Sequence, residues 1–143
     1  MIFNIFTEIR NWALERGIYD NGYNHKAEVR KDIEETFELM GNDKQRTNEL
    51  TDNFMNRYSG HIYNPPDKDI IDAHCDKIVF AINAIEALGY DAQLCMAETI
   101  AEINSRKGEH NPETNKWEKY TDEDHRALWY SANYSKCKRV SEE

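Results

Sequence analysis

The sequence predicts an all-α protein, a helical bundle of four to five main helices. Apolar residues recur at helical spacing in several segments, whereas strand-like alternation is scarce. Glycines and a Pro-Pro pair separate these segments, as expected where helices begin and end. With 143 residues, the chain is long enough for one domain with its own core. We therefore expect residues 1–143 to form a single domain.

The helices are expected in this order. The first should end near Gly17, because an apolar stripe precedes it: Phe3, Ile5, Phe6, Ile9, Trp12 and Ala13. The second runs from about His25 to Met40 and ends at Gly41-Asn42. An insert at about 42–67 carries a more polar helical segment and ends at Pro65-Pro66.

Two further helices complete the predicted bundle. A long helix spans about Asp67 to Leu88, with Gly89 as its stop, and another spans about Asp91 to Ser105. The C-terminal tail, about 108–143, contains a turn, "HNPETNKW". A short amphipathic stretch follows around Asp122 to Tyr130.

Composition excludes several classes of protein. The formal charge of −9 argues against broad binding to nucleic-acid phosphates, which needs a basic surface. The sequence has no apolar run of the roughly 18 residues that a membrane span needs. Three cysteines without a C-x-x-C pair predict reduced thiols and a cytoplasmic setting. An acidic chain of this kind is suited to gathering cations and reaching anionic ligands through them.

The first candidate site is the run "KDIEETFEL" in the second helix. It places Glu35 and Glu38 one helical turn apart, with Glu34 beside them. A solvated helix face would have much the same sequence, so this run alone does not distinguish a metal site from a solvated face.

A second acidic row, on the long helix, favours a metal site over a solvated face. Asp72 and Asp76 are one turn apart on the long helix, and Asn83 continues their row. A buried Asn83 would need a partner, either a substrate in the ligand pocket or a hydrogen bond in the core. Ile78 to Leu88 is apolar almost all round, so we expect this half to be buried. Asp76 lies too far from the helix start for the dipole to explain it. A buried carboxylate needs a partner, and oxygen ligands on two helices suit Mg²⁺ or Mn²⁺.

Basic and aromatic residues supply candidates for substrate binding. Lys31 is either an i,i+4 partner of Glu35 or a phosphate contact. Arg106, Lys107 and Lys119, with Lys116 nearby, follow the last core helix; they are either partners of the helix dipole or triphosphate ligands. Trp117 and Trp129 are possible base-stacking residues, although an aromatic residue is more often part of a core.

The chain resembles the MazG-like all-α nucleoside triphosphate pyrophosphohydrolases, in particular the short forms of phages and bacteria. The resemblance spans most of residues 9–119, and its pieces occur in the family's order. These are "IRNWALERGIYDNG", "KDIEETFEL" for K-x-x-E-E-x-x-E-L, "DAHCDKIVFAINAIEALGYD", and "EINSRKG" followed by "NKWEK".

The resemblance implies Mg²⁺-dependent hydrolysis of (deoxy)nucleoside triphosphates to a monophosphate and pyrophosphate, in control of the nucleotide pool. Glu35 and Glu38 take the E-x-x-E metal-ligand positions, and either one would orient the attacking water. Asp76 matches the Asp of the E-x-x-D motif. Ala73 replaces the Glu of that motif, with Asp72 as the substitute. The insert at 42–67 is also longer than usual for the family.

Other interpretations stay open at this point. A non-catalytic helical interaction protein would keep the same fold, and the loss of the motif Glu at Ala73 mildly favours it. Phosphoribosyl-ATP pyrophosphohydrolase is a related enzyme. The apolar long helix and the resemblance both predict a dimer or a dimer of dimers. We expect a cytoplasmic location, in the host if the chain is phage-encoded, with no nucleic-acid or membrane partner.

Overall fold

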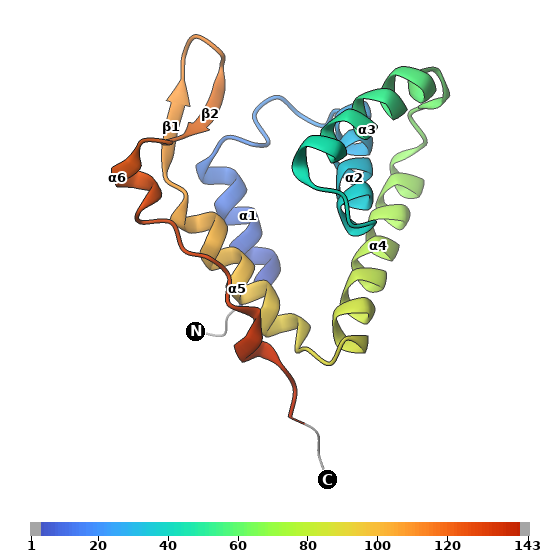
Figure 1. Ribbon diagram of the computed structural model, residues 1–143. Helices are drawn as coiled ribbons and strands as arrows, with labels where there is room; N and C mark the ends of the chain where they lie inside the picture. The colour runs from blue at the N-terminus through green and yellow to red at the C-terminus, as the bar shows by residue number, and fades with distance from the viewer. Residues whose placement is uncertain (1–3, 141–143) are drawn as a thin grey trace. The chain divides into compact units, whose positions relative to one another are not determined.

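The computed structural model describes residues 4–140 and is mostly helical, with one two-stranded hairpin (Figure 1). It divides into two compact units. The first comprises the residues up to Asn21 and those from Ala73 onward, and the second is Gly22–Asp72. The prediction of a helical protein is confirmed. Within the described residues, no helix is both long and apolar enough to cross a membrane.

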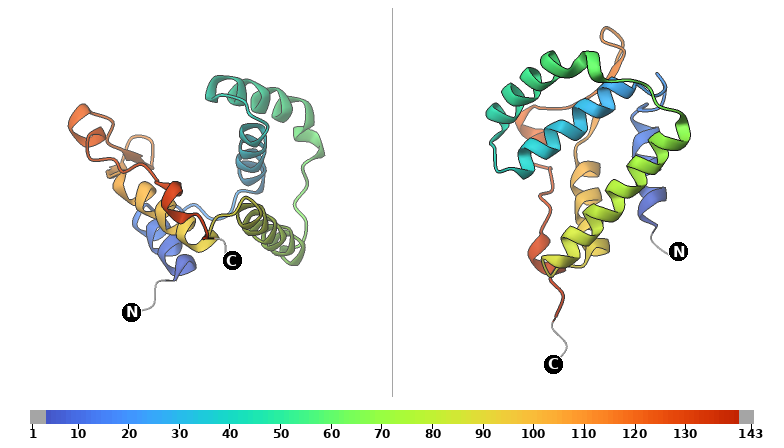
Figure 2. Two further views of the ribbon diagram at one scale, coloured as in Figure 1. Left: turned by 60° about the horizontal axis from the view of Figure 1, so that its bottom comes forward. Right: turned by 90° about the vertical axis from the view of Figure 1, so that its right-hand side faces the viewer.

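In the first unit, α1 (Ile5–Glu15) packs along α5 (Ala92–Ser105) (Figures 1 and 2). Asn4 caps α1 and Asp91 caps α5, each with a side-chain oxygen that accepts a backbone N–H three residues later. The buried core includes Ala13, Cys95 and Ile100. Of the expected apolar stripe of α1, Ala13 is buried, Phe6 is 69% exposed, and Phe3 lies outside the described residues.

A β-hairpin follows α5 where we expected only a turn. Strands β1 (Gly108–Asn111) and β2 (Lys116–Lys119) pair antiparallel, Gly108 opposite Lys119. Any side chain at position 108 would collide with the Glu118 carbonyl oxygen of the facing strand. Four-residue strands are too short for their alternation to stand out in the sequence, which is why the strands were missed.

The tail returns to the start of α5. After the short helix α6 (Glu123–Arg126), the 3₁₀ turn η2 (Tyr134–Cys137) leads into an antiparallel bridge between Tyr90 and Lys138. The Asp91 N–H donates to the Cys137 carbonyl and the Arg139 N–H to the Gly89 carbonyl, both at 2.9 Å. The tail is therefore an integral part of the first unit.

The second unit is a helical hairpin of α2 (His25–Leu39) and α3 (Lys44–Tyr58), followed by the 3₁₀ turn η1 (Ser59–His61). Phe37 and Phe54 meet edge to face across it, with ring centroids 6.5 Å apart. The insert at 42–67 thus adds a helix.

The long helix α4 (Asp67–Ala87) contains the boundary between the two units. Its apolar half is not buried, contrary to our expectation: Ile78, Val79 and Phe80 are 44%, 52% and 69% exposed, and no residue of α4 is buried. Periodicity identifies an apolar helix, but it does not say whether the same chain or a second chain covers it.

Candidate functional site

The carboxylates of Glu35 and Glu38 lie side by side on α2. Partial burial, the negative charge of Glu38 and a hydrogen bond with it raise the pKa of Glu35. The pKa is raised because two ionised carboxylates close together repel each other. A divalent cation between them would relieve that repulsion.

The neighbouring acids of α2 are already paired with cations. Glu28 pairs with Lys31 at 3.2 Å and Glu34 with Arg30 at 3.3 Å. Lys31 is thus turned toward Glu28, and the alternative in which it pairs with Glu35 is wrong. Among residues 4–140, neither Glu35 nor Glu38 has a Lys, Arg or His partner within ion-pair distance. The pair predicted to bind metal therefore carries charge that the chain does not neutralise.

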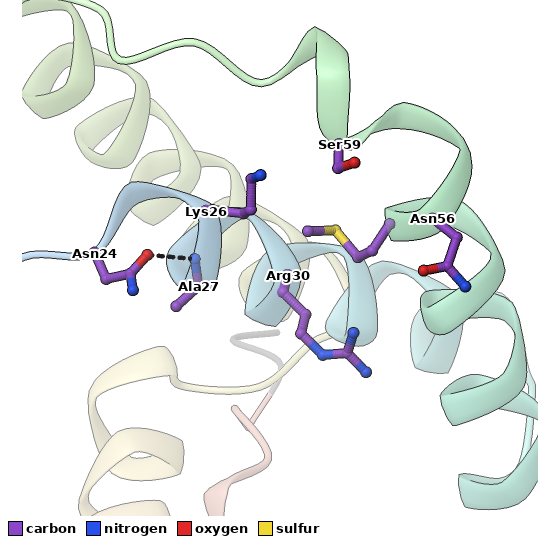
Figure 3. Close-up of a pocket in the computed structure, with 7 residues that line it drawn as sticks. Asn24, Lys26, Ala27, Arg30, Asn56 and Ser59 are labelled. Atoms are coloured by element: carbon purple, nitrogen blue, oxygen red, sulfur yellow. Dashed lines mark hydrogen bonds between the residues drawn. The ribbon is translucent and has the colours of Figure 1, made fainter.

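Arg30 fixes this part of α2 against α3. Its guanidinium donates to Asp52 on α3 and also contacts Glu34. A shallow depression of about 350 Å³ lies next to it, at the N-terminal end of α2 and the C-terminal end of α3 (Figure 3). Asn24 lines it while capping α2 through the Ala27 N–H at 3.1 Å. The carboxylate pair is on the C-terminal half of α2, outside this depression.

Asp72 and Asp76 are one turn apart on α4, as expected, but both are exposed, as is Asn83 on the same row. Contrary to our expectation, neither Asp76 nor Asn83 is buried in the single chain, so burial does not require a partner for either side chain. Helix α2 belongs to the second unit and most of α4 to the first. That the two acidic rows meet stays a prediction.

Within the described part of the chain, no three His, Cys, Asp or Glu side chains form a group that could hold a metal ion. Magnesium does not require such a cage. It keeps several waters and is commonly held by one or two carboxylates together with substrate phosphates. The donor chemistry of Glu35 and Glu38, two adjacent carboxylates without a cationic partner, fits this mode of binding.

Two of the predicted phosphate ligands come together in the first unit. Arg106, just after α5, and Lys119, on β2, both lie against the ring of Trp129, at 5.6 and 5.2 Å from its centroid. Arg126 on α6 is a third cation on this ring, at 5.9 Å. Lys107 is exposed, and no contact places it in this group. Arg126 was not among the predicted residues, although its i,i+3 spacing to Trp129 is a signal in the sequence.

A buried arginine holds this region together. The Arg16 guanidinium lies between Trp12 and Trp117, 5.1 and 4.6 Å from their ring centroids. It also donates to the carbonyl oxygens of Ile103 and Arg106, at 3.4 and 3.2 Å. Arg16 thereby ties α1 to the end of α5 and to the hairpin. Trp117 packs on this arginine, so it is a structural aromatic residue.

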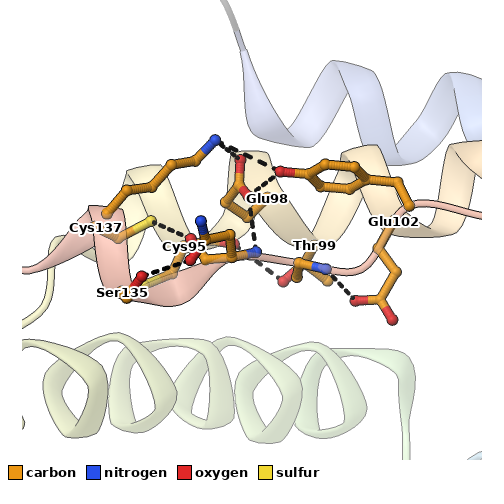
Figure 4. A network of polar contacts seen from close by, with 10 residues as sticks. Cys95, Glu98, Thr99, Glu102, Ser135 and Cys137 are labelled. Atoms are coloured by element: carbon orange, nitrogen blue, oxygen red, sulfur yellow. Dashed lines mark hydrogen bonds and ion pairs between the residues drawn. The ribbon is translucent and has the colours of Figure 1, made fainter.

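Glu98 on α5 anchors the tail (Figure 4). Hydrogen bonds from Tyr130 and the Asn133 N–H and an ion pair with Lys136 at 2.9 Å converge on its carboxylate. Led by the Tyr130 and Lys136 contacts, they lower the pKa of Glu98 to about 2. This buried glutamate is a structural anchor, because three donors of the tail already bind its two oxygens.

Comparisons with models of known families, with curated proteins and with solved structures find no match for this chain. The function of the chain is therefore inferred from its residues and from the motif resemblance.

Proposed function

We propose that the protein is a Mg²⁺-dependent nucleoside triphosphate pyrophosphohydrolase, as the motif resemblance implies. The observation that supports it is the Glu35–Glu38 pair: two carboxylates in contact, at the E-x-x-E positions, without a cationic partner among the described residues.

In this proposal Glu35 and Glu38 hold Mg²⁺, or Mn²⁺, and the sequence motif adds Asp72 and Asp76 as further ligands. When bound, the metal would neutralise phosphate charge and lower the pKa of a coordinated water. Either Glu35 or Glu38 would orient that water for attack. Attack at the α-phosphorus then gives a nucleoside monophosphate and pyrophosphate.

A panel of nucleoside and deoxynucleoside triphosphates tests this directly. With Mg²⁺, one or more members should yield the monophosphate and pyrophosphate, with no single phosphate released, and EDTA should abolish the reaction. The base preference emerges from the same panel.

The exposed apolar residues of α4 favour a second candidate, a binding protein without catalysis. The panel separates the two. If every triphosphate stays intact with Mg²⁺ and with Mn²⁺ while the protein still binds nucleotide or a partner protein, the enzymatic proposal is wrong.

The same residues support our proposal that the chain forms a dimer or a dimer of dimers through α4. Apolar side chains at this density are usually covered in solution. A second copy of the chain offers a self-complementary cover for one helix.

A further inference from the structure

Three cationic side chains from three different elements meet on one aromatic ring. Arg106 follows α5, Lys119 belongs to β2 and Arg126 to α6, and each cationic centre lies within 6 Å of the Trp129 ring centroid. We call these four residues the Trp129 cluster. In a chain with a net charge of −9, so many cations in one small patch need a physical reason.

The Trp129 cluster has more cationic side chains than carboxylates paired with them. Arg106 pairs with Glu102 at 2.8 Å. Neither Lys119 nor Arg126 forms an ion pair with any carboxylate in the part of the chain that the structure describes. Glu123 and Asp124 also belong to α6, yet neither pairs with Arg126. Attraction to the ring offsets only part of the repulsion among these cations.

Two hydrogen-bond donors in the cluster are also unused. Within residues 4–140, the Trp129 Nε1 and Arg106 Nε atoms are buried and have no acceptor. A buried donor without a partner is uncommon, and each such case calls for an explanation. These two donors are closed to solvent, whereas Lys119 and Arg126 are exposed and have no carboxylate partner among residues 4–140, so both cations can bind an anion.

We propose that the Trp129 cluster binds the phosphate groups of a polyphosphate ligand. Guanidinium and ammonium groups bind phosphate oxygens through charge-assisted hydrogen bonds. The ring of Trp129, already in contact with three cations, supports these charges and does not act as a platform for a base. That the ligand is a nucleotide or its pyrophosphate product rests on the proposed function; the anion site itself rests on the cluster alone.

The test follows the indole N–H signals of ¹⁵N-labelled protein during titration with sodium tripolyphosphate in EDTA. Trp129→Phe assigns the Trp129 signal. We expect the Trp129 signal to shift as tripolyphosphate is added and to stop shifting once the site is saturated. Lys119→Gln and Arg126→Gln should each weaken binding about tenfold, the loss of one charge-assisted hydrogen bond. Unchanged Trp12 and Trp117 signals show that the variants fold.

Lys44→Gln, on exposed α3 in the other unit, is the matched control and should bind as the unmodified chain does. Titrations with pyrophosphate and inorganic phosphate separate a polyphosphate site from a single-phosphate site. The proposal is supported if tripolyphosphate and pyrophosphate each bind at least tenfold more tightly than inorganic phosphate. A shift that does not saturate, or an equal loss in Lys44→Gln, overturns it.

The result is independent of catalysis. Glu38→Gln should leave this metal-free titration unchanged. If the protein binds tripolyphosphate but hydrolyses no triphosphate, the enzymatic proposal fails and the anion site stands. If it hydrolyses triphosphates but Lys119→Gln and Arg126→Gln bind tripolyphosphate normally, the anion site fails.

Discussion

Arg16 shows how a single charged residue can organise part of a core. Its guanidinium lies between two indole rings and donates to two carbonyl oxygens, while burial lowers its pKa. An ammonium group cannot reproduce this arrangement, because it is neither planar nor forked. The arginine therefore stabilises the junction of α1, α5 and the hairpin on which Arg106 and Lys119 depend.

Arg16→Ala should lower the free energy of unfolding of the first unit by about 2 to 3 kcal/mol, and Arg16→Lys should not restore it. Urea unfolding followed by tryptophan fluorescence measures this, because all three tryptophans belong to the first unit. Arg10→Ala, an exposed change on the same helix, is the control. An Arg16→Ala variant as stable as this control would contradict the role assigned to Arg16.

Glu98 predicts a pH dependence of tail docking. Its pKa is about 2 in the folded chain against a usual value of 4.5. The ionised form therefore stabilises the folded chain above about pH 4.5, and this contribution is lost as the pH falls toward 2. Hydrogen exchange of the Asn133 amide should rise across this window relative to other tail amides. In Glu98→Gln this extra rise should be absent; a rise that persists would show that other acids anchor the tail.

Most of the helices could be predicted from the sequence, but the exposure of helix α4 could not. The stops at Gly17, Gly41 and Gly89 and the break at Pro65-Pro66 are local signals, so helix positions followed from them. The exposure of α4 depends on what covers it, which periodicity does not encode. The contact between Glu35 and Glu38 followed from helical spacing, whereas the Trp129 cluster required the hairpin to bring β2 beside α5.

The carboxylate pair on α2 predicts an effect on stability. A raised pKa for Glu35 means that its contribution to folding is lost as the pH rises past that pKa, when both carboxylates become charged. Glu38→Gln removes one of the charges, so without metal at neutral pH it should slow hydrogen exchange of α2 amides. Mg²⁺ should slow this exchange in the unmodified chain and have no effect in Glu38→Gln. An equal response of both proteins to Mg²⁺ would exclude the pair as a metal ligand.

At the scale of the whole molecule, the exposed apolar face of α4 predicts self-association. Phe80→Glu should shift the protein toward monomer in sedimentation velocity at micromolar concentration, because it places a charge within the proposed contact. Tyr63→Glu, equally exposed but in the segment before α4, should leave the association state unchanged. A chain that is already monomeric at this concentration would contradict the proposal.

The proposed hydrolase activity depends on the carboxylates of Glu35 and Glu38. The rate of pyrophosphate release, compared across matched variants, tests whether it does. With Mg²⁺ and the best substrate of the panel, Glu35→Gln and Glu38→Gln should each lower the rate by orders of magnitude. Glu34→Gln, one position away and paired with Arg30, should keep a rate within a few-fold of the unmodified chain. Similar rates for all three variants, or no pyrophosphate release by the unmodified chain, would contradict the central claim.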